Sequence, residues 1–378
     1  MLTFYSIRTG LNSSSEADFI LREDQFGSQA FFLRRDEARS NHAGSKAVLD
    51  AEVIFMQLGM TPIPIYSSGN AQGVKRKLRH LGQLSRLLTL PMGSFLFIQY
   101  PMYRMKRDYV DLLRKVKALR KLRLVFLVHD LEMIRHAFPE NPDLAFRDRE
   151  MLGAADAIIV HNRNMADFLE REHNVDRSKL ICLGIFDYLV PTGTLPKTDI
   201  SDKKSICIAG NLSPDKSGYI KGLIDLLPDD MSLNLYGVNY EQGTAGSNVI
   251  YHGSFDADIL PDLLNSSFGL VWDGPRSDTC AGNMGNYMRF NDPHKVSLYI
   301  SAGIPVIIWS EAALAGFIKE RHIGFTVSSL EEIPEKLGNV TEEDYQSYRS
   351  NLYPLMRQVR DGYFLKEAVK AAIDSAGV

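Results

Sequence analysis

Residues 287–309 contain side chains that could bind a diphosphate, next to the element that would present them. The polar loop 291–293 leads into an expected helix that carries His294 and Lys295 in its first turn. The N-terminus of a helix has unpaired N–H groups and a partial positive charge, so it attracts phosphate. An ordinary strand–helix unit with a proline in its first turn fits the same spacing. Because a lysine and a histidine add to the attraction, we favour a diphosphate site made by Asn291, Pro293, His294 and Lys295.

Polar side chains also follow other expected strands in the second half of the chain. One strand runs into Asn211, after which Lys216 could reach a phosphate. The next strand ends at Tyr236 and Gly237, where the aromatic ring could stack on a nucleobase or simply pack. Asp273 follows a later strand and could bind sugar hydroxyls or cap its loop. No G-x-G-x-x-G follows a strand and no P-loop is present, which argues against nicotinamide and ATP chemistry.

The first half of the chain supplies candidate acid and base groups. A buried strand ends in His129 and Asp130, and either side chain could take a proton from an acceptor hydroxyl. Neighbouring residues of a strand point to opposite faces, so we expect one of the two to reach the site and favour Asp130. His161 and Asn162 follow another strand in the same way. No Ser-His-Asp constellation, nucleophile elbow or metal-ligand cluster is present in the sequence.

Short apolar runs alternate with helical stretches in both halves of the chain. This alternation predicts parallel sheets covered by helices, with ligands at the carboxyl ends of the strands. We expect a first domain over 1–185, a hinge rich in proline and glycine over 186–204, and a second domain over 205–340. Residues 341–378 are expected to form helices that pack back toward the first domain. The expected strands are 30–33, 62–66, 95–99, 124–128, 157–160, 205–209, 232–236, 249–252, 268–272, 305–309 and 324–327, and one early helix is expected over 46–58.

Length and composition fit two domains, because 378 residues are many for a single core. No apolar run is long enough to span a bilayer, and the first residues lack the features of a signal peptide. An odd number of cysteines without a secretion signal indicates a reducing cytoplasm. Of the cysteines at 182, 207 and 280, we expect Cys182 and Cys207 to be buried in strands. Asp148 and Glu150 are expected on a solvated helix face.

The segment 75–123 is strongly basic although the whole chain has a net charge of only −3. It contains 14 lysines and arginines against two acids, which gives a segment charge of +12. Such a block could contact anionic lipid at the inner membrane or a pyrophosphate-linked acceptor. Solvated faces of two helices would have the same composition. No recognised binding motif accompanies the block, so nucleic acid is not an expected partner.

The order of several motifs resembles bacterial sugar-nucleotide glycosyltransferases of the GT-B fold. The most similar groups are the β-1,6-galactofuranosyltransferases of O-antigen synthesis and the glucosyltransferase 3 group, which extends glycans on serine-rich adhesins. The resemblance begins near Phe31 and runs to the C-terminus. The motifs that carry it are Gln99-Tyr100-Pro101, His129-Asp130-Leu131, His161-Asn162, Gly184–Leu189, Ala209-Gly210-Asn211-Leu212, Leu235-Tyr236-Gly237, Val271-Trp272-Asp273-Gly274 and Asn291–Lys295.

This resemblance implies two Rossmann-like αβα domains whose parallel sheets face a central cleft. It implies a UDP-sugar, with galactofuranose or glucose, bound mainly by the second domain, and a lipid- or protein-linked glycan acceptor on the first. Neither a metal nor another cofactor is required, and relatives form homo-oligomers. Carried over by position, the donor-site residues would be Asn211, Lys216, Tyr236, Asp273, Asn291, His294 and Lys295, with Gly44 and Ser45 approaching from across the cleft.

The sequence departs from many retaining GT-B enzymes, which have two glutamates before the Gly-x-Pro-Val stretch. Phe290 and Leu298 occupy those positions here, and the nearest glutamate is Glu311. The stereochemical outcome and the catalytic base are therefore open. A sugar-nucleotide epimerase is an alternative, although it would need more acids in the cleft. A non-catalytic subunit is another, although it would be expected to lose the residues of 291–295.

Overall fold

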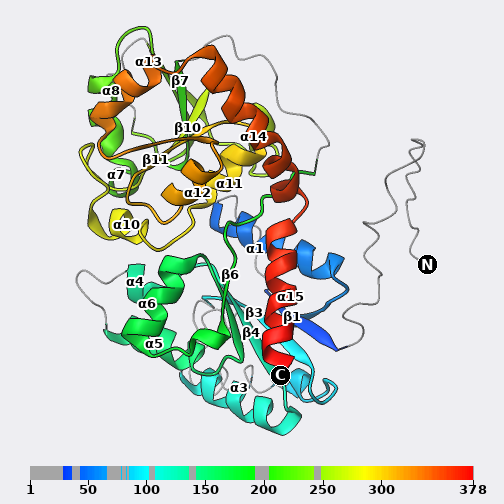
Figure 1. Ribbon diagram of the computed structural model, residues 1–378. Coiled ribbons are helices and arrows are strands. Elements are labelled where there is room, and N and C mark those ends of the chain that lie inside the picture. Colours follow the sequence, from blue (N-terminus) through cyan, green and yellow to red (C-terminus); the bar gives the residue numbers. More distant parts are fainter. Residues whose placement is uncertain are drawn as a thin grey trace, which may run out of the picture.

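The described residues form two parallel β-sheets of six strands each, one from each half of the chain. Figure 1 shows the second sheet above the first, with the C-terminal helix reaching down beside the first sheet. Residues 1–28, Tyr66 and the parts 75–77, 79–81, 83–84 and 102–106 of segment 75–123 lie outside the described residues. The computed structural model describes residues 29–35, 43–65, 78, 82, 85–101, 107–135, 142–191, 204–241 and 248–377.

The first sheet has the strand order β2-β1-β3-β4-β5-β6. Along β4, Leu124, Phe126 and Val128 point into one core cluster, and Val125 and Leu127 point into another. This alternation is the period of a strand buried on both faces. The first cluster is covered by α3 (Arg107–Arg120), α5 (Pro142–Leu152) and α6 (Arg163–His173), and the second by α1 (Ala43–Gln57) and α15 (Tyr363–Gly377). The strands are β1 (Ala30–Arg35), β2 (Thr61–Ile65), β3 (Phe95–Tyr100), β4 (Arg123–Val128), β5 (Ala157–Val160) and β6 (Leu180–Cys182), and α4 (Glu132–Arg135) and η1 (Arg177–Lys179) are short turns of helix.

The second sheet has the order β12-β11-β10-β7-β8-β9. Helix α11 (His294–Ser301) packs directly on it, because Gly269 leaves room for the ring of Tyr299. A Cβ at Gly269 would lie 2.3 Å from that ring. The strands are β7 (Ser205–Asn211), β8 (Ser232–Val238), β9 (Val249–Gly253), β10 (Phe268–Val271), β11 (Val306–Trp309) and β12 (Gly324–Val327). The remaining elements are α7 (Pro214–Ser217), α8 (Tyr219–Leu226), α9 (Leu260–Leu263), α10 (Gly282–Tyr287), α12 (Ala315–Glu320), η2 (Leu330–Glu332), α13 (Ile333–Gly338) and α14 (Glu342–Arg360).

The last two helices pack against different sheets. Side chains of α14 belong to the core of the second sheet, whereas those of α15 belong to the core of the first. The carboxylate of Asp187 accepts hydrogen bonds from the backbone N–H groups of Phe364 (3.2 Å) and Leu365 (2.7 Å). A carboxylate at that end of a helix is favourable, so the segment between the sheets fixes the start of α15.

Two predictions about individual side chains are wrong. Cys182 is exposed, because it lies at the end of the edge strand β6. Asp148 is 1% exposed, because α5 turns it toward Tyr100 in the first sheet. Its neighbour Glu150 is partly exposed and pairs with Arg114, and Cys207 is buried as predicted.

Candidate functional site

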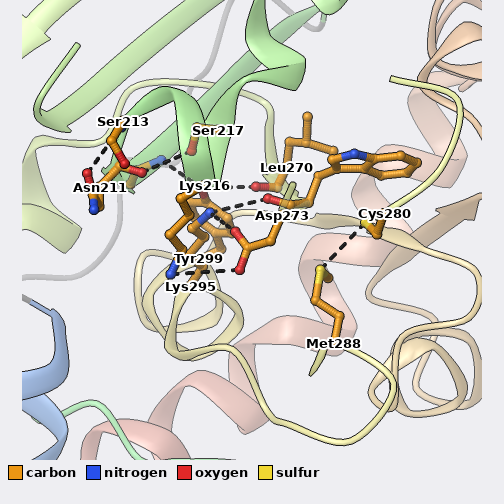
Figure 2. Close-up of polar contacts among 12 residues, drawn as sticks. Asn211, Ser213, Lys216, Ser217, Leu270, Asp273, Cys280, Met288, Lys295 and Tyr299 are labelled. Atoms are coloured by element: carbon orange, nitrogen blue, oxygen red, sulfur yellow. Dashed lines mark hydrogen bonds and ion pairs between the residues drawn. The ribbon is translucent and has the colours of Figure 1, made fainter. Parts of the chain in front are cut away.

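The start of α11 places Lys295 against the carboxyl end of β10. Lys295 Nζ is 2.9 Å from Asp273 Oδ1, and Lys216 Nζ is 3.7 Å from Asp273 Oδ2 (Figure 2). Lys295 is 9% exposed and Asp273 is 6% exposed. Two lysines therefore share one buried carboxylate, and the group has an excess positive charge beside a helix N-terminus. An anion is the ligand that such a group attracts most strongly.

Glycines at the ends of β7 and β8 keep the space beside Lys295 free of side chains. A Cβ at Gly237 would lie 1.7 Å from the carbonyl oxygen of Gly210, so a side chain does not fit there. Both glycines have positive φ, +127° for Gly210 and +146° for Gly237. At Gly210 a Cβ would lie 3.6 Å from Cε of Lys295. The backbone at Gly210 thus approaches the lysine without an intervening side chain, and Gly237 lets β8 lie close to that glycine.

Asn211 and Tyr236 have structural contacts of their own. Asn211 Oδ1 accepts hydrogen bonds from the N–H of Ser213 (3.1 Å) and from Asn239 Nδ2 (3.0 Å), which orders the loop before α7. Tyr236 is 2% exposed, and its ring stacks on His252 at a centroid distance of 4.4 Å. Burial raises the pKa of Tyr236 to about 12, so its hydroxyl is neutral. In this structure the ring is a packing group.

His294 differs from Lys295 although the two are adjacent. Its Nε2 lies 3.2 Å from the carbonyl oxygen of Asp187, and its ring stacks on Tyr188 at 4.9 Å. Burial lowers the pKa of His294 to about 4, so the imidazole is neutral at pH 7. The side chain therefore contributes no positive charge and joins α11 to the segment between the two sheets.

His129 and Asp130 follow the end of β4 at Val128, and their side chains have different surroundings. His129 Nε2 lies 2.7 Å from Gln99 Oε1, and its ring stacks on Phe186. Asp130 is partly exposed and lies 3.3 Å from Arg135 Nη1. Burial raises the pKa of Asp130, while Arg135 and, from the second sheet, Lys216 act in the opposite direction. Asp130 is therefore close enough to Lys216 of the second half to be affected by its charge.

The first turn of α1 contains Gly44 and Ser45, whose side-chain surroundings lie outside the described residues. The next residue, Lys46, is buried and connects the two halves of the molecule. Its Nζ lies 2.7 Å from Asp50 Oδ1 and 2.7 Å from Asp258 Oδ1. The start of α1 is thereby fixed against the second half of the chain.

Two buried carboxyl groups near the site were not identified from the sequence. Asp292 is 3% exposed; its Oδ1 accepts a hydrogen bond of 2.6 Å from Asn162 Nδ2, and burial raises its pKa to about 8. Asp148 accepts hydrogen bonds from the hydroxyl of Tyr100 and from the N–H of Met133 (2.7 Å), and burial raises its pKa to about 6. Neither had a sequence signal, because their partners lie 130 and 48 residues away.

Asn291 and Pro293 complete the start of α11. Pro293 is the residue before the first helical turn, and its backbone is extended. The side-chain oxygen of Asn291 is buried and has no hydrogen-bond partner among the described residues.

The described residues contain no group of three or more histidine, cysteine, aspartate or glutamate side chains placed to hold a metal ion. None of the helices that the structure describes is long and apolar enough to cross a membrane.

Comparisons with known proteins agree with this geometry. Residues 32–185 and 206–372 match models of the N-terminal and C-terminal domains of glucosyltransferase 3-like proteins. Beta-1,6-galactofuranosyltransferase WbbI of Escherichia coli K12 is 32% identical over 348 residues, 91% of this chain and 96% of that protein. Glucosyltransferase 3 of Streptococcus gordonii is 26% identical over 84% of this chain and 89% of its own length. Anabaena Alr3699/HepE, solved with UDP-glucose, has a TM-score of 0.59 at 11% identity, covering 92% of this chain and 99% of that one.

Two six-stranded parallel sheets, with their carboxyl ends meeting at α11, define a two-domain α/β protein of the GT-B fold. The chain belongs to the glucosyltransferase 3-like family and is a bacterial glycosyltransferase. The epimerase and the non-catalytic subunit are not favoured, because the relatives are hexosyltransferases.

Proposed function

We propose that this glycosyltransferase moves a hexosyl unit, galactofuranose or glucose, from a UDP-sugar to a glycan acceptor, without a metal. The product would belong to a cell-surface polysaccharide or a glycoprotein. The observation that carries the proposal is the group formed by Lys216, Asp273 and Lys295 at the start of α11. Its excess positive charge suits the diphosphate of a nucleotide sugar, and the printed names of the relatives supply the sugars.

In the proposed reaction, Lys295, Lys216 and the N-terminus of α11 stabilise the charge that develops on the departing diphosphate. Fixed positive groups at a developing charge are usually the largest contribution to such catalysis. A divalent ion has the same role in other enzymes, and two lysines can replace it here. Asp130 would take the proton of the acceptor hydroxyl if the reaction inverts the anomeric centre. Its raised pKa brings a carboxylate closer to the range that suits a general base.

The first experiment is a thermal-shift series with UDP, UDP-glucose, UDP-galactofuranose, GDP, ADP and NAD, each with and without EDTA. A ligand that binds only the folded protein raises the melting temperature, by an amount set by its concentration and dissociation constant. We expect stabilisation by UDP and one UDP-sugar that is unchanged by EDTA. Stabilisation that EDTA abolishes would contradict the metal-independent mechanism. No response to any nucleotide would contradict the donor assignment.

We also propose that the protein acts at the cytoplasmic face of the membrane, through the basic segment 75–123. Among its described residues, Arg86, Lys115 and Lys121 are exposed, as are Leu88 (42%) and Leu119 (68%). Each basic residue near an anionic surface contributes about 1 kcal/mol. Co-sedimentation should therefore occur with anionic vesicles, weaken with salt, and be absent with zwitterionic ones. Equal binding to both vesicle types would refute the electrostatic contact.

We also propose, from the resemblance, that the protein forms homo-oligomers. Light scattering during gel filtration measures their mass.

A further inference from the structure

The segment that leads into α11 is held by side chains and backbone of the first half of the chain. We call residues 287–292 the bridge segment. The N–H of Leu131 donates to the hydroxyl of Tyr287 at 3.0 Å. Asn162 Nδ2 donates both to the carbonyl oxygen of Phe290 (2.9 Å) and to Asp292 Oδ1 (2.6 Å). The loops after β4 and β5 therefore contact the peptide that begins the donor-site helix.

The centre of this contact is buried and polar. The N–H of Asp292 donates to His161 Nδ1 at 2.9 Å, next to the bond between Asp292 and Asn162. All three side chains are buried. Buried polar groups that lose a partner keep the full cost of leaving water, so such a contact has one preferred geometry. Asn162 is itself fixed, because its Oδ1 accepts the N–H of Met165 at the start of α6.

We propose that Asn162 and Asp292 are positioning residues, which set where the start of α11 lies relative to the loop that carries Asp130. This inference rests on the proposed roles of Lys295 and Asp130. Asp292 precedes Lys295 by three residues, and the bridge segment bonds to Leu131, the neighbour of Asp130. A displacement of either half by about 1 Å can reduce turnover about 100-fold, because the reacting groups must be close and aligned.

Exchanging the two side chains tests the inference. Asn162→Asp keeps the oxygen that accepts from Met165 but loses the amide that donates to Phe290 and Asp292. We expect kcat to fall about tenfold or more, with the dissociation constant of UDP within about twofold of the original, because the lysines of the donor site are unaffected. The double variant Asn162→Asp/Asp292→Asn restores a donor and an acceptor in the reverse order, and should recover most of the kcat.

The matched control is Asn164→Asp, two residues further along the same helix, where the amide makes an exposed bond of 3.0 Å to the carbonyl oxygen of Arg289. This control should keep kcat within about twofold of the original, because an exposed contact contributes little. Equal losses in Asn164→Asp and Asn162→Asp, no loss in Asn162→Asp, or no recovery in the double variant would overturn the inference.

Small-angle X-ray scattering of the free protein gives a second readout that needs no turnover. Asn162→Asp should increase the radius of gyration, and the double variant should reverse the increase, because the bond joins the two halves. An unchanged radius in Asn162→Asp would contradict the inference even if no tested sugar were transferred. Failure of the original protein to bind UDP would instead refute the proposed function and leave this scattering result standing.

Discussion

At the scale of single residues, Lys295 has two roles that substitution can separate: it pairs with Asp273 in the folded protein, and in the proposed reaction it supplies positive charge to the diphosphate. It is paired with Asp273 in a buried site, so Lys295→Ala leaves that carboxylate with only Lys216, at 3.7 Å. Breaking a buried ion pair from one side costs about 3–5 kcal/mol. We therefore expect Lys295→Ala to lower the melting temperature as well as to reduce kcat about 100-fold or more.

Adding Asp273→Asn to Lys295→Ala removes the unpaired charge. The melting temperature should then recover, while kcat stays low, because the positive charge is still absent. Thermal melts and turnover measured on both variants separate the effect of Lys295 on stability from its effect on kcat. A double variant with the turnover of the original protein would exclude Lys295 from the donor site.

The sequence indicates which residues lie at the start of α11 better than it indicates whether their side chains are charged or buried. The helix after residue 293 and the lysine in its first turn follow from spacing alone. Whether His294 is charged depends on Tyr188 and on the carbonyl group of Asp187, both more than 100 residues away. The same applies to Asp292, which is buried and bonded to Asn162, 130 residues away. Contacts between residues so far apart in the chain produce no local pattern in the sequence.

At the scale of elements, α5 has a role in holding the loop after β4. Asp148 on α5 accepts from Tyr100 at the end of β3 and from Met133 N in the turn after Asp130. Asp148→Asn should cost about 1–3 kcal/mol in stability, because one buried oxygen acceptor becomes a donor. It should also raise the acceptor KM or lower kcat severalfold, since the loop with Asp130 loses an anchor.

Glu150→Gln is the matched control for Asp148→Asn. It lies on the same helix and pairs with Arg114 at 2.8 Å in a partly exposed position, where such pairs contribute at most about 1 kcal/mol. Denaturant melts and steady-state kinetics should show little change for Glu150→Gln. Equal effects of the two substitutions would show that α5 does not act through Asp148.

The strands were largely predictable because each is a short apolar run bounded by turn residues. Phe95–Tyr100 and Val306–Trp309 are buried on both faces, as parallel sheets require. The second is wholly apolar, and the first is apolar except for Gln99. A strand was expected at Cys182 but its bounds were not predicted, because Leu180–Cys182 has only three residues and lies at the sheet edge. The sequence also did not show that α14 packs on the second sheet and α15 on the first, since both helices have similar amphipathic patterns.

At the scale of the whole molecule, buried acids near the junction of the two halves make stability depend on pH. Burial raises the pKa of Asp187 to about 7 and that of Asp292 to about 8. In this range the unfolded chain has already released the protons that the folded protein retains, so the free energy of unfolding falls as pH rises. His161 and His294, with pKa values lowered to about 4, act in the opposite direction only below about pH 6.5.

Between pH 7 and pH 8 the titration of Asp292 should dominate. We expect the free energy of unfolding to decrease by about 1 kcal/mol over that unit through Asp292, and Asp292→Asn to remove most of the decrease, leaving the smaller part due to Asp187. Urea melts at several pH values measure both. An identical pH dependence in the original protein and in Asp292→Asn would show that Asp292 does not retain a proton in the folded state.

The path of the chain also constrains how such enzymes can be recombined. The chain leaves the first sheet after β6 and returns to it with α15, whose end is bonded to Arg123 and whose start is bonded to Asp187. A single crossover between relatives in the intervening segment would therefore pair the first sheet of one parent with the last helix of the other. Exchange of the second half as a unit needs two crossovers, one before β7 and one between α14 and α15, so that each parent's final helix stays with the sheet it was selected to cover.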